Sequence, residues 1–271
     1  MWWRSQCGTQ STRGCVTLDT VDIGENAGAW FPRGPGRRLE KVAAGLYRVR
    51  TRGGRAYVAV DGRDVTIIDV GAPGSGPILA RALNDLGLTM DDVRQVVLTH
   101  AHLDHVGALP EVQAMCSAPI AIHVGDAPEV GAGSLRNPFV HPGIARVTDP
   151  IVRILDPGPS RVDIGLVDGD RFPVFGGMQV VHMPGHTPGS AAFLFTERGI
   201  VLTGDAVQHR FGELLPPSRT FTRCMDEAID SIARLATFDF EMIAFSHFRP
   251  VRAGGSRRLE EALGRTGCNA A

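Results

Sequence analysis

The chain has 271 residues, of which 43% are hydrophobic, with 28 basic and 29 acidic side chains. This length allows one large domain or two small ones, and the apolar content is enough for a sizeable buried core. With a formal net charge of −1, the chain has no excess of positive charge that would indicate binding to nucleic acid or to an anionic membrane surface.

Composition changes near residue 38. Residues 1–38 are rich in Gly, Ser, Thr and Arg without a sustained period, which predicts a disordered N-terminal extension. Residues 39–271 alternate between strand and helix patterns, so we expect one α/β domain there. We expect residues 124–170 to be its least regular part. Strands are predicted at 46–50, 56–60, 65–70, 95–99, 120–123, 179–183, 191–196, 200–204 and 242–246, and helices at 77–86, 106–115, 226–236 and 256–263.

The cysteines and the first residues bear on the cellular location. Five cysteines are widely spread and form no CxxC pair, which predicts neither a disulfide framework nor a thiolate zinc site and favours a reducing compartment. The chain begins without an apolar stretch of the length that a signal peptide needs, and no apolar stretch is long enough to span a membrane. We therefore expect a cytoplasmic protein with no membrane partner.

The strongest chemical signal is the sequence THAHLDH at residues 99–105. Residues two apart in an extended chain point to the same side, so His100 and His102 should project together. Asp104 and His105 follow where a helix should begin and offer a second pair of ligands. Imidazole and carboxylate suit zinc, and also iron or manganese. The alternative is a polar loop without metal, but packing so many titratable groups together without a cation would be costly.

Three further residues of ligand type follow predicted strands. His186 lies in a PGHTPG turn, Asp205 ends IVLTGD, and His247 ends MIAFSH. Each alone could be a turn residue, a helix cap or a surface histidine. Together with His100, however, they stand at the ends of four predicted strands, where layered α/β folds form their sites. A shared site explains this coincidence.

This set of residues resembles the metallo-β-lactamase superfamily, whose hallmark is HxHxDH followed by a His, an Asp and a final His, and the match runs from about residue 39 to residue 250. The resemblance implies a four-layer αββα sandwich with the site at one sheet edge. It also implies two zinc ions, or iron or manganese in their place. One metal would be held by His100, His102 and His186, the second by Asp104, His105 and His247, with Asp205 as the bridge and Asp69 orienting the ligands.

The resemblance further implies a hydrolase in which a metal-bound hydroxide, oriented by Asp104, attacks a small-molecule ester, thioester or lactone. Asp205 stands where β-lactamases of this fold have Cys or Ser, which argues against antibiotic hydrolysis. Gln208 stands where acyl-homoserine lactonases carry Tyr, which weakens a lactonase assignment without excluding it. The remaining candidate is a hydrolase of small esters or thioesters, similar to glyoxalase II and its relatives. Two alternatives stay open: a persulfide dioxygenase with a single iron, and a non-catalytic metal-binding protein.

Two loops are expected to roof the pocket, at residues 207–223 and 136–146, although both could be ordinary surface loops. Arg210 or Arg249 could meet an anionic group of the substrate. The sequence does not indicate the oligomeric state. From the first loop, the candidate substrate-binding residues are Gln208, His209, Arg210 and Phe211.

Overall fold

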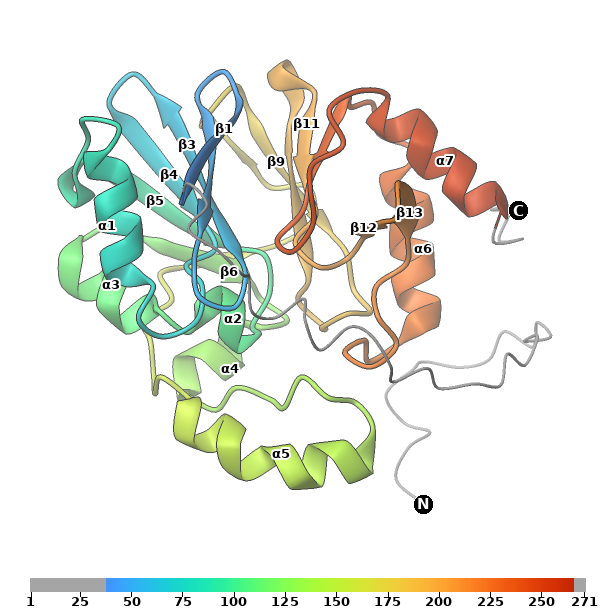
Figure 1. Ribbon diagram of the computed structural model, residues 1–271, viewed down its shortest axis with the longest axis horizontal. Coiled ribbons are helices and arrows are strands. Elements are labelled where there is room, and N and C mark those ends of the chain that lie inside the picture. Colours follow the sequence, from blue (N-terminus) through green and yellow to red (C-terminus); the bar gives the residue numbers. More distant parts are fainter. Residues whose placement is uncertain (1–37, 266–271) are drawn as a thin grey trace. The chain divides into compact units, whose positions relative to one another are not determined.

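The computed structural model describes residues 38–265 (Figure 1). Two β-sheets lie face to face, and helices cover the outer face of each, so the layers run helix, sheet, sheet, helix. The predicted αββα sandwich is thereby confirmed. The predicted disordered extension, residues 1–38, lies outside the described residues except for its last position and stays a prediction.

The first sheet has seven strands in sequence order, β1 to β7. Strands β1 to β4 are antiparallel neighbours, whereas β4 to β7 run parallel. Parallel neighbours need crossover connections, and helices provide them here. The strands are β1 (Leu39–Ala43), β2 (Leu46–Arg50), β3 (Arg55–Asp61), β4 (Asp64–Ile68), β5 (Val93–Leu98), β6 (Ile120–His123) and β7 (Ile164–Leu166); the helices are α1 (Gly76–Asn84), α2 (Leu103–Val106), α3 (Leu109–Met115), α4 (Ala127–Ala132) and α5 (Pro142–Leu155).

The second sheet has five strands in the order β14-β11-β10-β9-β8. Only β14 and β11 run parallel in it, and a separate hairpin, β12–β13, follows β11. Helices α6 and α7 cover its outer face. The elements are β8 (Arg171–Phe172), β9 (Met178–His182), β10 (Ala191–Phe195), β11 (Ile200–Leu202), β12 (Gln208–Arg210), β13 (Glu213–Leu215), α6 (Met225–Leu235), β14 (Met242–Ala244) and α7 (Gly255–Arg265).

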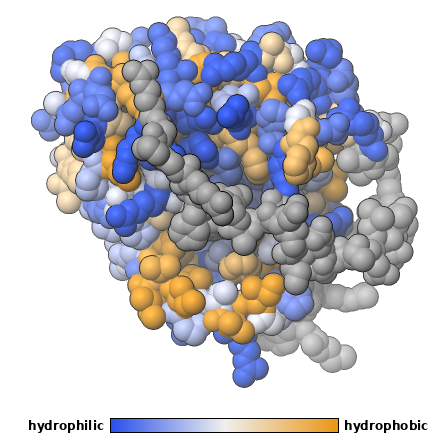
Figure 2. Space-filling view, in the orientation of Figure 1, coloured by the Kyte–Doolittle hydropathy of each residue, from blue (hydrophilic) through white to orange (hydrophobic). Residues whose placement is uncertain are grey.

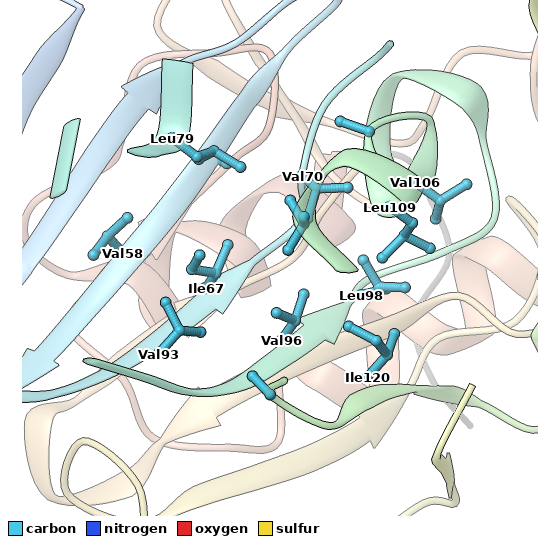
Figure 3. Close-up of a cluster of buried hydrophobic side chains, with 14 of the residues drawn as sticks. Val58, Ile67, Val70, Leu79, Val93, Val96, Leu98, Val106, Leu109 and Ile120 are labelled. Atoms are coloured by element: carbon cyan, nitrogen blue, oxygen red, sulfur yellow. The ribbon is translucent and has the colours of Figure 1, made fainter. Parts of the chain in front are cut away.

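Three clusters of buried hydrophobic side chains hold the layers together. One lies between the sheets and includes Ile68 and Phe193, which are fully buried. A second joins the first sheet to α1 and α3 through Val96 and Leu79 (Figure 3), and a third joins the second sheet to α6 and α7. Central strands such as β5 read as nearly continuous apolar runs because both of their faces are buried.

The structure differs from the predicted elements most clearly in three places, besides the short strands β1 and β8, which were not predicted. The helix predicted at 106–115 is two helices, α2 and α3, and Pro110 stands in the first turn of α3, where its missing N–H costs no hydrogen bond. Residues 124–170, predicted to be irregular, contain α4, α5 and β7. The hairpin β12–β13 lies where a loop was predicted, and its three-residue strands are too short to give a clear alternation.

Helix α5 exposes its apolar stripe. Val147 and Ile154 are 74% and 80% exposed, and Figure 2 shows a hydrophobic patch at the position that α5 occupies in Figure 1. The helix has no buried residue, so its outward stripe contributes nothing to the core. Among residues 38–265, no helix is long and apolar enough to cross a membrane.

Two cysteines lie in the described part of the chain. Cys116, at the end of α3, is a free thiol, and Cys224 is the residue before α6. The cytoplasmic location stays a prediction.

Candidate metal centre

Seven titratable side chains meet beyond the ends of strands β5, β9, β11 and β14. They form three overlapping groups, in each of which the potential ligand atoms lie within 4.8 Å of one another. We call His100, His102 and His186 the first cluster, and Asp104, His105 and His247 the second cluster; the remaining group is His100, His105 and Asp205. The structure therefore brings together all seven residues that the sequence singled out.

In the first cluster, three imidazole nitrogens point at one another. Nε2 of His100 and Nε2 of His186 each lie 3.1 Å from Nδ1 of His102, and all three rings are buried. A single ring nitrogen cannot form a good hydrogen bond to both neighbours, whereas a cation between the three nitrogens would satisfy them all. Burial lowers the pKa of His102 to about 4 and that of His186 to about 3, so both rings are neutral at pH 7 and have a free lone pair.

The second cluster combines imidazoles with a carboxylate. Oδ2 of Asp104 lies 3.2 Å from Nε2 of His247 and 3.7 Å from Nε2 of His105. Burial alone would lower the pKa of His247, but the carboxylates of Asp205 and Asp104 raise it to about 10. Burial alone would raise the pKa of Asp104, but His105 and His247 lower it to about 2. Nε2 of His105 is buried and has no hydrogen-bond partner in the described structure, as expected of an atom placed for a metal ion.

Asp205 lies between the two clusters. Its carboxylate oxygens are 3.2 Å from Nε2 of His247, 3.6 Å from Nε2 of His105 and 3.9 Å from Nε2 of His186. Burial would raise the pKa of Asp205, but His247 and His105 hold it well below its usual range. An ionised carboxylate in contact with both clusters has the geometry needed to bridge two cations.

Side chains of the first sheet hold the segment that carries His247. The hydroxyl of Tyr57 donates to the carbonyl of Phe245 at 2.8 Å, and the guanidinium of Arg55 donates to the carbonyl of His247 at 2.9 Å. Arg48 donates in the same way to the carbonyl of Phe248. These partners lie about 190 to 200 positions apart in the chain, and no local pattern in the sequence indicated them.

Two buried aspartates support the clusters. Asp69, predicted to orient ligands, accepts a hydrogen bond from Nδ1 of His105 at 2.8 Å. Asp126 accepts one from the backbone N–H of Ala101 at 2.8 Å, between the first two histidines. Sequence reasoning missed Asp126, because an aspartate before Ala-Pro is typical of a helix N-terminus.

The predicted substrate-binding residues lie at the β12–β13 hairpin. Gln208 and Arg210 are partly exposed there, and Nδ1 of His209 lies 2.8 Å from the carbonyl oxygen of Arg249. Phe211 occupies the turn with φ 54° and is 93% exposed. The turn therefore directs Phe211 to solvent, and substrate binding by these four residues stays a prediction.

The two segments predicted to roof the site contact each other. The backbone N–H of Val140 donates to the carbonyl of Thr220 at 3.0 Å, and the rings of Phe139 and Phe221 are 5.1 Å apart. Oγ1 of the next residue, Thr222, lies 3.4 Å from Nδ1 of His186. These two segments are therefore connected to the first cluster, and the prediction that they cover a substrate pocket stays a prediction.

Arg223 is a residue at this roof that the sequence did not single out. Its backbone N–H donates to the carbonyl of His186, and its side chain is partly buried. Burial lowers the pKa of Arg223, and the charge of Arg136 lowers it further. Arg136 is paired with Glu129 at 2.6 Å, whereas no ion pair of the Arg223 guanidinium occurs within residues 38–265.

The sandwich fold and the two clusters of imidazoles and carboxylates define a metal-dependent hydrolase. Residues 49–247 match the model of the metallo-beta-lactamase superfamily, and the chain belongs to that family. Among solved structures, a metallo-beta-lactamase family protein from Thermus thermophilus superimposes with a TM-score of 0.65 at 23% identity, over 84% of this chain and 81% of that one.

Curated relatives agree with this assignment. An uncharacterized protein of Bacillus subtilis, YobT, is 30% identical over 76% of this chain and 88% of its own length. The probable metallo-hydrolase YflN of the same organism is 26% identical over 68% of this chain and 75% of its own. A hydroxyacylglutathione hydrolase of Cereibacter sphaeroides is 30% identical over 53% of this chain and 43% of its own length.

Proposed function

We propose that the protein is a dinuclear zinc hydrolase that cleaves a small ester, thioester or lactone. The observation that carries the proposal is the contact of one ionised carboxylate, Asp205, with histidines of both clusters. Such a bridge fits a centre for two cations, whereas a single-iron site would leave part of the second cluster without a role.

In this proposal His100, His102 and His186 hold one zinc ion, and Asp104, His105 and His247 hold the other. When bound, two cations lower the pKa of a water shared between them and polarise the substrate carbonyl. Asp104 is ionised at neutral pH. Its carboxylate would orient the attacking water, accept a proton from it and pass that proton to the leaving group.

The roof of the site supports a substrate with an anionic group. We assign recognition of that group to Arg223, since a partly buried guanidinium without an ion pair is available for a carboxylate or phosphate. The hydroxyacylglutathione hydrolase among the relatives is named for a thioester-type substrate. The chain spans less than half of that protein, so the thioester enters here as a substrate class to test.

The test is a hydrolysis panel of thioesters, lactones, carboxylate esters and phosphodiesters, run on metal-stripped and zinc-loaded protein. We expect zinc-dependent turnover of at least one carbonyl ester class. Replacing His186 by Ala should abolish that turnover, while Glu260→Ala, a change at an exposed residue of α7, should leave it intact.

Two results would contradict the proposal, one from this panel and one from an oxygen-consumption assay of iron-loaded protein. Turnover that is equal with and without zinc would exclude metal-dependent hydrolysis. Oxygen consumption that requires one iron per chain, without hydrolysis, would favour the dioxygenase alternative instead.

A further inference from the structure

Asp126 is a fully buried carboxylate that turns away from its own helix. It immediately precedes α4, where an aspartate commonly caps the first turn, but its side chain makes no capping hydrogen bond. Its Oδ2 accepts instead from the backbone N–H of Ala101 at 2.8 Å and from the hydroxyl of Thr187 at 2.7 Å. Its Oδ1 accepts from the backbone N–H of Gly189 at 2.7 Å.

These three donors belong to the two segments that carry the first cluster. Ala101 stands between His100 and His102, and Thr187 directly follows His186. One carboxylate therefore joins the segment after β5 to the turn after β9, which come from different sheets. These hydrogen bonds fix the backbone on both sides of the first cluster.

The turn after β9 also packs against the segment before α4 without room for side chains. A Cβ atom added to Gly189 would lie 2.6 Å from Cγ of Asp126, and one added to Gly125 would lie 2.8 Å from the carbonyl oxygen of Pro188. The backbones before α4 and after His186 can approach this closely only because both positions are glycine. This packing holds the Asp126 carboxylate in one position.

Asp69 occupies the corresponding place at the second cluster. Its Oδ2 lies 2.8 Å from Nδ1 of His105, and its Oδ1 accepts from the backbone N–H of Thr99. The Asp126 carboxylate has no hydrogen bond to a residue of the second cluster in the described structure. Asp69 has none to a first-cluster residue, but it is linked to that cluster through the hydroxyl of Thr99, which lies 3.1 Å from Nδ1 of His100.

We propose that Asp126 is a positioning residue for the first cluster alone, so that two separate buried carboxylates set the metal affinities of the two clusters. This inference rests on the proposed function, because it requires both clusters to bind metal. Asp126→Asn keeps the size of the side chain but replaces one carboxylate oxygen by an NH2 group. This group cannot accept a hydrogen bond from the backbone N–H of Ala101 or Gly189, so one of the three contacts is lost.

The experiment is a zinc titration of the full chain, with free zinc fixed by a chelator buffer. Side-chain ¹⁵N NMR signals of the histidines report each cluster separately, through His102 and His186 for the first and through His105 and His247 for the second. We expect Asp126→Asn to weaken zinc binding at the first cluster by about 10- to 100-fold and to leave the second within about twofold.

Two variants serve as comparisons. Asp69→Asn should lose more zinc affinity at the second cluster, with a smaller loss at the first because Thr99 links Asp69 to His100. Asp92→Asn is the matched control: this aspartate is also buried and accepts a backbone hydrogen bond, from Thr89, but it stands just before the start of β5, away from the clusters. It should leave both affinities unchanged.

Equal loss at both clusters in Asp126→Asn, or no loss at the first, would overturn the inference and leave the proposed function standing. If that variant does not fold, Thr187→Val removes only one of the three donors and should weaken the first cluster alone, by a smaller factor; no selective effect there would overturn the inference. Absence of zinc from both clusters of the wild-type protein would refute the proposed function itself.

Discussion

Nδ1 of His105 and Oδ2 of Asp69 lie 2.8 Å apart, and both side chains are buried. Asp69 reaches this position with φ 61°, a conformation that residues other than glycine seldom adopt. The contact orients the His105 ring so that its Nε2 faces the carboxylates of Asp104 and Asp205. A strained residue at the end of β4 thus fixes a ligand-type atom 36 positions later in the chain.

The hydroxyl of Thr99 is predicted to stabilise this arrangement. It lies 2.9 Å from Oδ2 of Asp69 and 3.1 Å from Nδ1 of His100. Thr99→Val should lower the free energy of unfolding by about 1–3 kcal/mol, because buried polar groups lose a partner. Chemical denaturation measures this change. Thr66→Val, at a buried threonine of β4, should cost less; equal losses would contradict a special role for Thr99.

Metal binding at the two clusters should differ in its dependence on pH. In the metal-free protein, carboxylates raise the pKa of His105 and His247, the latter to about 10, so both rings carry a proton at pH 7.5. A cation must displace these protons, so affinity at the second cluster should rise with pH up to about 10. Burial lowers the pKa of His102 to about 4, so affinity at the first cluster should stay level until the pH falls toward that value.

Calorimetry in two buffers of different protonation enthalpy checks this prediction. Zinc binding at the second cluster should release up to two protons, one from each raised histidine, and binding at the first should release almost none. If both binding events released the same number of protons, the histidines of the two clusters would not differ in protonation, and the prediction would be wrong.

Arg223→Met should change substrate selection more than catalysis. Loss of a charge-assisted hydrogen bond of about 1.5–3 kcal/mol would raise KM for anionic substrates by roughly 10- to 100-fold and leave neutral analogues unaffected. Steady-state kinetics on matched anionic and neutral esters separate KM from kcat. Arg210→Met, at a partly exposed arginine of the hairpin, is the comparison. A larger effect of this variant on KM would mean that Arg210, and not Arg223, binds the anionic group.

Core and surface phenylalanines should differ sharply in their contribution to stability. Phe193 is fully buried between the sheets, so Phe193→Ala should lower the free energy of unfolding by about 3–5 kcal/mol. Phe211 is 93% exposed, so Phe211→Ala should change it by less than about 0.5 kcal/mol. Thermal or urea unfolding of both variants measures the difference. A substantial loss for Phe211→Ala would mean that this ring is covered in solution.

The sequence predicted most of the fold and the grouping of the candidate site. Strands such as β5 and β10 were recognised because full burial gives continuous apolar runs. The family pattern named the seven clustered residues, and the structure brings them together. Helix α5 was missed because Pro142, Gly143 and the internal Pro150 are typical of a loop, although its apolar residues recur at helical spacing.

The residues that support the site were harder to predict. Asp126 resembles an ordinary helix cap in the sequence, and only the fold shows that its partners are Ala101 and Thr187. Arg55 holds the carbonyl of His247 across 192 positions. Such contacts depend on how the two sheets are placed against each other, which local periodicity does not specify.

The central claim is that seven side chains hold two zinc ions, and crystallography tests it most directly. Crystals of the wild-type protein grown with zinc should be measured on both sides of the zinc absorption edge. We predict two anomalous peaks, one among the rings of His100, His102 and His186 and one beside His105 and His247, with Asp205 touching both. A single peak, or none within bonding distance of these residues, would contradict the account.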